Sequence, residues 1–432
     1  MLARPAGLLL GASLLLAAAP ALAIGSVEKG DYSLEAIGGA RLTGVYLHYP
    51  DVPLFFPETD SGLAAAVLRL LLDGDLGPYV DYDVNLYADF SYAPAALTGG
   101  TFATVGSFET PYRTTYLSWD FLDSRGMEGQ MGVDRFSFNL EVDRVSLTFG
   151  RFPVNYTTTN IFTPNDFFAP FSPTAINQMY KPGVDAIQMG VTTGMLSTVE
   201  LVGVMGYGTD DVPAWGRSAL LARLSTILWN FEWALLGGKV AERWIVGASL
   251  QGELGPFGVR AEGHAGFPDA HGDFKLDDHD RDGGYLDDIH GRLAVGFDYM
   301  HAWQNLSISA EYMYVSDGAD RTSLYLTRFT SFYPDDVPFM GRHYVGLSAG
   351  LEIIPILRFN AMALFNTTDY SGLASMMLLY NIADEIDAML GVLVPWGEEP
   401  VEDLGPPTHE PSIESEFGLM PLMLFLEMRF YF

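Results

Sequence analysis

The chain contains no cysteine among its 432 residues. Disulfide bonds, thiolate metal sites and cysteine nucleophiles are therefore excluded. Basic residues are also scarce, since 23 lysines and arginines stand against 54 aspartates and glutamates, and the net charge is −31 at pH 7. Nucleic acid is therefore not an expected partner, because phosphate recognition needs a basic surface.

Long hydrophobic runs are missing beyond the first residues of the chain. The most apolar later stretch, 63–72, is interrupted by Arg69, whereas a spanning helix needs about 20 apolar residues. Yet 49% of all residues are hydrophobic and the mean hydropathy is +0.15. A chain this apolar must bury these side chains in a large core or spread them over lipid-facing strands.

Residues 1–23 have the three parts of a secretory signal peptide. Arg4 supplies the positive charge, residues 8–19 are apolar, and the Ala-Leu-Ala of 21–23 fits the small-x-small cleavage pattern. The apolar part is too short for a membrane anchor. We expect an exported chain of residues 24–432, whose net charge changes from −31 to −32 when Arg4 is lost.

Apolar and polar residues alternate along many later segments. Across 80–90 the even-numbered positions are apolar, and the odd-numbered ones are aspartate, asparagine or tyrosine. A period of two over this length is typical of a tilted membrane strand with one face toward lipid and the other toward the interior. The same alternation recurs at 135–142, 259–265, 292–299, 344–352 and 357–365.

The connections between these segments alternate between short and long. Short ones are expected at 73–75, 142–143, 194–195, 229–230, 255–256 and 354–355, and long ones at 50–61, 93–112, 153–182, 267–287, 316–340 and 397–413. We interpret them as periplasmic turns and extracellular loops. The sequence predicts an all-β fold, a single transmembrane antiparallel β-barrel of about 18 strands (roughly 16–20). Within 93–131 one strand cannot be told from two.

The last strand carries the most specific signal. Its two faces consist of Leu424, Leu426, Met428, Phe430 and Phe432 on one side and of Phe425, Glu427, Arg429 and Tyr431 on the other. This strand resembles the terminal strand of bacterial outer-membrane β-barrels, in which a final aromatic residue and alternating apolar residues form the insertion signal. The resemblance implies a place in the cell outer membrane among lipid and lipopolysaccharide, and contact of this strand with the barrel-assembly machinery. A homo-oligomer is left open.

A second stretch is similar to porin-like proteins. It reads Phe-Gly-Arg-Phe-Pro at 149–153, continues with an aromatic segment at 162–168, and ends with Lys-Pro-Gly-Val-Asp-Ala at 181–186. In such proteins a strand ends in Gly-Arg, a loop rich in proline and aromatic residues follows, and Gly-Val-Asp opens the next strand. The loop 153–182 would fold into the lumen, cap the outside or pack on a neighbouring subunit. The candidates for a narrow passage at this loop are Arg151, Asp166, Lys181 and Asp185.

Charged residues on the polar face are the other candidates for the pore lining. They are Arg135, Glu141, Arg260, Glu262, Arg292, Asp298, Arg342, Glu352, Arg358, Glu427 and Arg429. Such residues would select solutes by charge or would only brace the inner wall through pairs across neighbouring strands.

Two short motifs suggest other chemistry. Residues 278–283 read D-x-D-x-D-G, the start of a calcium loop. The position of the bidentate glutamate is Ile289, so a nearby aspartate would have to replace it, and the alternative is a solvated acidic loop. The candidate Ca²⁺ ligands are Asp278, Asp280, Asp282 and Asp288. No other cofactor is expected. G-x-S-x-G at 346–350 places its serine inside an alternating segment, not at a strand-to-helix turn, so we expect no enzyme.

The sequence therefore favours a porin-like channel for passive diffusion of small hydrophilic solutes or ions. Cation preference is expected, because acidic residues near a channel mouth concentrate cations. The alternative is a barrel that acts as a sheath or scaffold for a partner, such as an electron-transfer protein. The chain contains no C-x-x-C-H motif, so it would not bind haem covalently itself.

Overall fold

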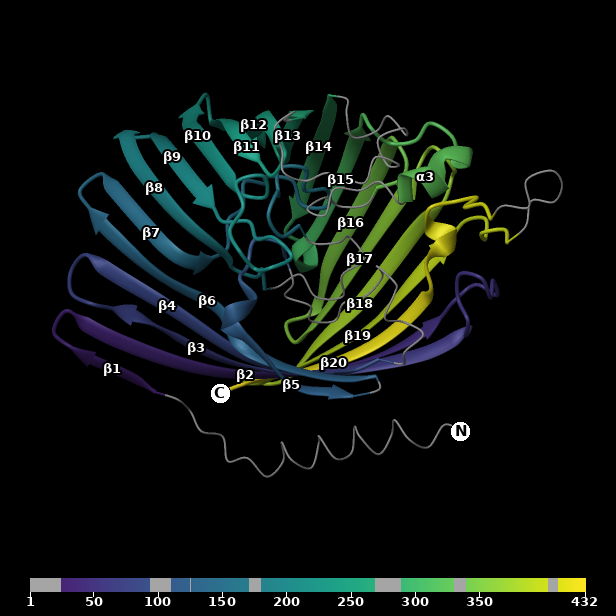
Figure 1. Cartoon of the computed structure of the whole chain (residues 1–432), viewed down its shortest axis with the longest axis horizontal. Helices are drawn as coiled ribbons and strands as arrows, with labels where there is room; N and C mark the ends of the chain where they lie inside the picture. The colour runs from purple at the N-terminus through teal and green to yellow at the C-terminus, as the bar shows by residue number, and fades with distance from the viewer. Residues whose placement is uncertain are drawn as a thin grey trace.

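The computed structural model describes residues 25–93, 110–124, 126–170, 180–268, 289–329, 339–402 and 411–432. The predicted signal peptide lies outside these residues. The described strands form one antiparallel sheet of 20 strands. Eighteen of them close into a barrel, because β2 pairs with β20 (Figure 1). The predicted fold class and strand number are confirmed.

The barrel strands follow one another around the ring in chain order. They are β2 (Tyr32–His48), β3 (Asp60–Asp75), β4 (Val80–Tyr92), β6 (Met127–Val142), β7 (Val145–Phe152), β8 (Val184–Gly194), β9 (Ser197–Val204), β10 (Ala219–Leu228), β11 (Phe231–Val240), β12 (Arg243–Leu254), β13 (Phe257–Pro268), β14 (His290–His301), β15 (Leu306–Val315), β16 (His343–Ile354), β17 (Leu357–Asn366), β18 (Gly372–Ala383), β19 (Ile386–Trp396) and β20 (Leu422–Tyr431).

Short elements accompany the ring. Strands β1 (Ser26–Lys29) and β5 (Ser118–Ser124) pair with β2 and β6, and the helical turns are η2 (Thr115–Leu117), η3 (Trp303–Asn305), η4 (Thr322–Leu324), α3 (Tyr325–Phe329) and η5 (Phe417–Leu419). None of the helices within the described ranges is long and apolar enough to cross a membrane.

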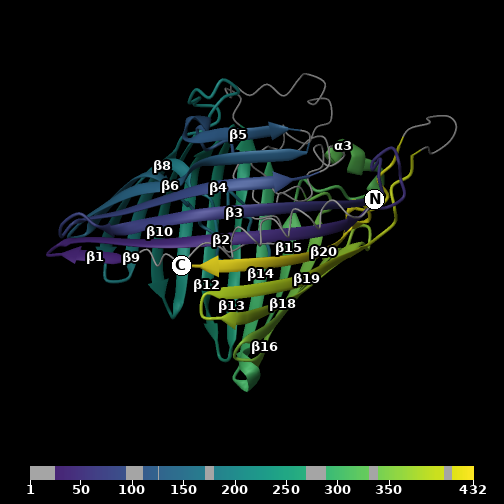
Figure 2. The same cartoon turned by 90° about the horizontal axis from the view of Figure 1, so that it is seen from below.

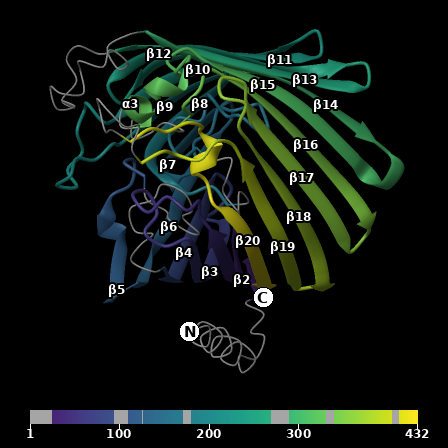
Figure 3. The same ribbon diagram turned by 90° about the vertical axis from the view of Figure 1, so that its right-hand side faces the viewer.

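Alternation along each strand sorts its side chains between two faces. In β12, Trp244 and Val246 are 50% and 63% exposed, whereas the alternate residues Arg243 and Ile245 are buried. Large apolar side chains are exposed on the outer face of most other strands as well. This outward apolar face is the one that meets lipid in membrane barrels, and the tilted strands that carry it are seen in Figures 2 and 3.

The two ends of the barrel differ in their connections. At one end, the turn end, the strands are joined by tight turns, such as Trp229 and Asn230 between β10 and β11. Both of these residues have positive φ, at 56° and 64°, as the favoured two-residue hairpin turn requires. Long connections lie mainly at the opposite, loop end. Two connections there, 241–242 and 367–371, are nevertheless short, which the sequence did not indicate.

The ambiguous stretch 93–131 holds one barrel strand and one side strand. Strand β6 pairs with β4 from Met127 to Leu140, which is nearly its whole length. Its other edge pairs with β7 in one half and with β5 in the other. Strand β5 therefore fills the part of that edge that β7 does not reach, and it is not a member of the closed ring.

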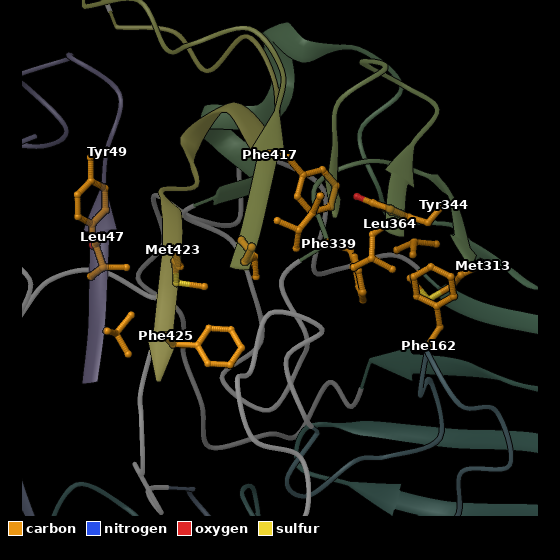
Figure 4. Packing of buried hydrophobic residues seen from close by; sticks show 14 of the residues in the cluster. Leu47, Tyr49, Phe162, Met313, Phe339, Tyr344, Leu364, Phe417, Met423 and Phe425 are labelled. Atoms are coloured by element: carbon orange, nitrogen blue, oxygen red, sulfur yellow. The ribbon is translucent and has the colours of Figure 1, made fainter. Parts of the chain in front are cut away.

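The inner face is not uniformly polar. In its loop-end half, two apolar clusters line the wall. One lies mainly on β15 to β20 and β2, and it includes Leu47, Tyr344, Leu364 and Phe425 (Figure 4). The other covers β8 to β12. Aromatic residues of the connection between β7 and β8 belong to both clusters, so this connection must lie inside the barrel.

Candidate functional site: the constriction of the barrel

Residues 153–170, the first described part of the connection between β7 and β8, lie in the interior of the barrel (Figure 1). Phe162 is fully buried and lies 6.3 Å from the ring of Tyr344 in β16 and 5.9 Å from that of Phe339. Gly346 leaves space for Ile161 and Phe162, since a Cβ at this position would lie 2.9 Å from Ile161 Cγ2 and 3.0 Å from Phe162 Cε2. Of the three alternatives for this loop, the structure shows the inward one for residues 153–170, which we call the inner loop.

Glu262 of β13 holds the first part of the inner loop. This buried carboxylate accepts hydrogen bonds from the hydroxyls of Thr157 and Thr158 at 2.8 and 2.9 Å. It also accepts from the backbone N–H groups of Thr158, Thr159 and Asn165. One carboxyl group thereby satisfies backbone N–H groups at both ends of an irregular segment.

Glu311 of β15 holds the next part of the inner loop. Its carboxylate is 3% exposed and accepts from three consecutive backbone N–H groups, those of Asn160, Ile161 and Phe162, at 2.7, 2.9 and 3.0 Å. Successive N–H groups of this kind form a concave site for an anion. Because β13 and β15 lie five and seven strands beyond β8 in the ring, the two carboxylates fix the loop to a distant part of the wall.

At the base of the inner loop, Arg151 and Asp185 form a bidentate ion pair. The two Arg151 nitrogens lie 2.6 and 3.0 Å from the Asp185 oxygens, and the residues are opposite each other in the β7–β8 register. Arg151 is fully buried and also donates to the carbonyls of Val133 and Thr114. Asp185 in turn accepts from the Tyr207 hydroxyl at 3.0 Å. These two predicted residues brace the base of the loop.

Asp134 is the centre of a second charged cluster, and sequence reasoning missed it. Its carboxylate has no exposed surface and pairs with Arg69 at 2.8 Å and with Arg113 at 2.7 Å. A bulge in β6 explains its direction, because Asn85 pairs with Arg135 while Leu86 pairs with Val133, which leaves Asp134 as the extra residue. The one available signal was Arg69, the only charge in the apolar stretch 63–72.

Tyr180 and Lys181 lie next to this cluster, a few residues before β8 begins. The Tyr180 ring lies between the guanidinium groups of Arg69 and Arg135, at 3.8 and 4.0 Å from its centroid. Arg135 also donates to the Lys181 carbonyl, and the Lys181 ammonium pairs with Asp166. Arg69 and Lys181 keep 16% and 11% of their side-chain surface exposed, against 0% for Asp134 and 3% for Asp166. In these two ion pairs the basic side chains are therefore more exposed than the acidic ones.

A third group of charges lies at the seam where the barrel closes. Glu427 has no exposed surface; it pairs with Arg429 at 2.6 Å and with Arg41 at 3.8 Å, and it accepts from the Thr43 hydroxyl at 3.0 Å. Arg41 and Arg429 are direct neighbours across β2 and β20. The carboxylate between them offsets the repulsion of these like charges.

The other candidates for the pore lining are dispersed. Arg260 pairs with Asp298 at 2.8 Å and donates to the Thr158 carbonyl of the inner loop. Arg292 is buried on the inner face of β14, and Arg342 donates to the Gly318 carbonyl just before β16. The remaining three, Glu141, Glu352 and Arg358, lie close to the turn end.

The predicted calcium ligands, Asp278, Asp280, Asp282 and Asp288, lie outside the described residues. Among the residues that are described, no group of three or more histidines, aspartates or glutamates could hold a metal ion. The serine of the G-x-S-x-G motif, Ser348, lies in β16 and contacts the Ser309 hydroxyl at 2.6 Å. This is a pair across two strands.

No family model matches the chain, and no curated protein sequence matches it. Solved structures of outer-membrane porins do resemble it. OccAB3 of Acinetobacter baumannii aligns with a TM-score of 0.55 at 12% identity, covering 92% of this chain and 99% of that one. OccD3 (OpdP) of Pseudomonas aeruginosa aligns with a TM-score of 0.51 at 10% identity, covering 95% and 93%. OpdK of the same organism, solved with vanillate, aligns with a TM-score of 0.52 at 9% identity, covering 92% and 98%.

At such low identity the likeness concerns the fold. The chain has the fold of an outer-membrane porin, a closed antiparallel barrel of 18 strands. The porin-like barrel expected from the sequence is confirmed at this level.

Proposed function

We propose that this protein is a porin-like channel of the cell outer membrane, through which small hydrophilic solutes or ions diffuse passively. The observation that carries the proposal is the inner loop, held across the lumen by Glu262 and Glu311. A loop fixed in this way would narrow the lumen of an 18-strand barrel, which supports a passage for small solutes. The likeness to porin structures supports the same function.

The structure gives less support to a sheath around a partner protein. The inner loop occupies the middle of the lumen, and the two apolar clusters join it to the wall on both sides. A partner protein would have to displace these contacts, each of which buries apolar surface. Nothing in the described residues supports an enzyme, because Ser348 lies within a strand and a nucleophile elbow needs a strand-to-helix turn.

Two features of opposite sign bear on charge selectivity. The acidic surplus of the whole chain, 54 acidic against 23 basic residues, favours cations at the mouths. At the constriction, the more exposed groups are Arg69 and Lys181. We propose a weak cation preference for small ions, with the basic groups at the constriction available to a solute carboxylate. The structure of OpdK with vanillate, which carries a carboxylate, supports the proposed contact between basic groups and a solute carboxylate.

Reversal potentials in a planar bilayer with a salt gradient test this proposal. We expect stepwise conductance and a weak cation preference in the wild type. Arg69→Gln removes one partly exposed charge from the constriction and should raise the ratio of cation to anion permeability by about twofold. The matched control is Arg144→Gln, at the exposed turn between β6 and β7, which should change the ratio little. Clear anion selectivity of the wild type would overturn the cation preference.

A further inference from the structure

A polar cavity lies beside the inner loop, toward the turn end of the barrel, and the proposed channel function does not account for it. Its volume is about 280 Å³, and it is lined by residues 153–158 of the loop and by the inner wall. Five consecutive strands, β8 to β12, contribute one polar side chain each. These side chains are Gln188, Glu200, Arg223, Glu232 and Gln251.

The charges of the cavity are already paired with one another. Arg223 lies between two carboxylates, at 2.9 Å from Glu232 and 3.5 Å from Glu200. Gln251 donates to the second oxygen of Glu232 at 2.7 Å. With two acids and one base, the wall carries a net charge of −1. All three charged side chains are partly exposed, at 16% for Arg223, 22% for Glu200 and 32% for Glu232, so they are reachable from the lumen.

This arrangement gives a charged ligand of either sign little to gain. An anion would meet the two more exposed carboxylates, and a cation would have to compete with Arg223, which already pairs with both of them. Hydrogen-bonding capacity is nevertheless left over. The amides of Gln188 and Gln251 line the cavity beside the carboxylates of Glu200 and Glu232. A hydroxyl can accept from an amide N–H and donate to a carboxylate at the same time, which neither an ammonium nor a carboxylate can do.

One aromatic side chain also lines the cavity and offers an apolar face to a solute. Tyr156 lines the cavity from the inner loop, and its ring centroid lies 6.0 Å from Arg223 Cζ. A volume of about 280 Å³ corresponds to roughly nine waters at about 30 Å³ each, which is enough for one sugar ring. We propose that this cavity is a binding subsite for a neutral polyhydroxylated solute of monosaccharide size. The subsite rests on the proposed function, since the solute reaches it through the lumen.

Isothermal titration calorimetry on the folded full-length protein in detergent tests the subsite, with D-glucose as the probe. Sodium acetate and methylammonium chloride serve as the charged comparisons. We expect D-glucose to bind and the two ions to bind more weakly or not at all. Gln188→Leu and Gln251→Leu each remove an amide from the wall and should weaken glucose binding by about tenfold. The matched control is Asn139→Leu, an amide of β6 outside the cavity, which should leave glucose binding unchanged.

Heat-modifiable mobility in a detergent gel shows whether each variant is folded. If only one of the two glutamine variants folds, that variant alone is sufficient to test the subsite. No glucose binding to the wild type, tighter binding of methylammonium or acetate, or glucose binding that survives a folded glutamine variant would overturn the subsite. Potassium chloride conductance is recorded separately, without sugar. A protein that conducts but does not bind glucose contradicts the subsite alone, whereas a folded protein that does not conduct contradicts the channel.

Discussion

Charged residues at the constriction are held in place by buried partners of opposite charge. Asp134 illustrates the energetics, because its carboxylate has no exposed surface and receives both Arg69 and Arg113. Taking such groups out of water is costly, and the cost is offset only while every partner is present. The acids are therefore part of the scaffold that presents the more exposed bases to the lumen.

Asp134→Ala should strongly destabilise the barrel. Arg113, which is 7% exposed, would lose its carboxylate, and breaking a buried pair on one side costs about 3 kcal/mol or more. The midpoint of heat unfolding, read from mobility in a detergent gel, should fall. Asp120→Ala in the exposed strand β5 is the control, since Asp120 accepts a surface hydrogen bond from Gln130 at 3.1 Å. Equal midpoints for the two variants would contradict this role of Asp134.

Sequence reasoning found part of the site at this scale. The Gly-Arg and Gly-Val-Asp motifs indicated Arg151 and Asp185, and the structure joins them in a buried pair at the base of the loop. Asp134 was missed because the bulge places two adjacent residues on the inner face, which strict alternation assigns to opposite faces. The partners of Glu262 and Glu311 are mostly backbone N–H groups, which no side-chain pattern reveals.

Strands are the elements that the sequence predicted best, since a period of two fixes which side chains face lipid. Loops were predicted less well, because their course depends on contacts with distant strands. The inner loop follows β7 directly but is fixed by β13 and β15, about 100 and 150 residues further along the chain. The sequence did not predict that the loop-end half of the inner wall is apolar. The apolar residues there pack against loops that are distant in the sequence.

The closing seam depends on a glycine. Phe432 exchanges two backbone hydrogen bonds with Gly38, and a Cβ at Gly38 would lie 2.1 Å from the Phe432 ring. Gly38→Ala should therefore displace the terminal ring and lower both the yield of assembled barrel and its heat-unfolding midpoint. Gly44→Ala in the same strand is the control, because a Cβ there would meet nothing within 4 Å. A Gly38→Ala variant as stable as the control would contradict this account of the seam.

At the scale of the whole molecule, a buried acid ties loop-end segments together. Glu416 lies between β19 and β20, accepts hydrogen bonds from Tyr344 and Asn366, and donates its backbone N–H to Asp369 at 2.8 Å. Tyr325 of α3 also faces this group through its hydrogen bond with Asn366. Burial, together with the charge of Asp369, raises the pKa of Glu416 to about 7.

The stability of the loop-end packing should therefore fall as the pH rises. A carboxyl whose pKa is raised in the folded state binds its proton more tightly there. Its favourable contribution is complete below the ordinary pKa of 4.5 and is lost between pH 4.5 and about 7. The loss amounts to roughly 3 kcal/mol. Heat-unfolding midpoints at pH 5 and pH 8 should differ less in Glu416→Gln than in the wild type. Glu414→Gln, a neighbouring carboxyl bonded to Ser412, should behave like the wild type.

The central claim is that Glu262 and Glu311 hold the inner loop across a conducting lumen. The most direct test is the unitary conductance, in one planar bilayer system, of the wild type and of the Glu262→Gln, Glu311→Gln double variant. Glutamine removes the charge that the loop N–H groups bind and adds a donor that faces them. We predict small, steady steps for the wild type and larger, noisier ones for the double variant. Equal conductance in the two proteins, or a folded wild type without any steps, would contradict the account.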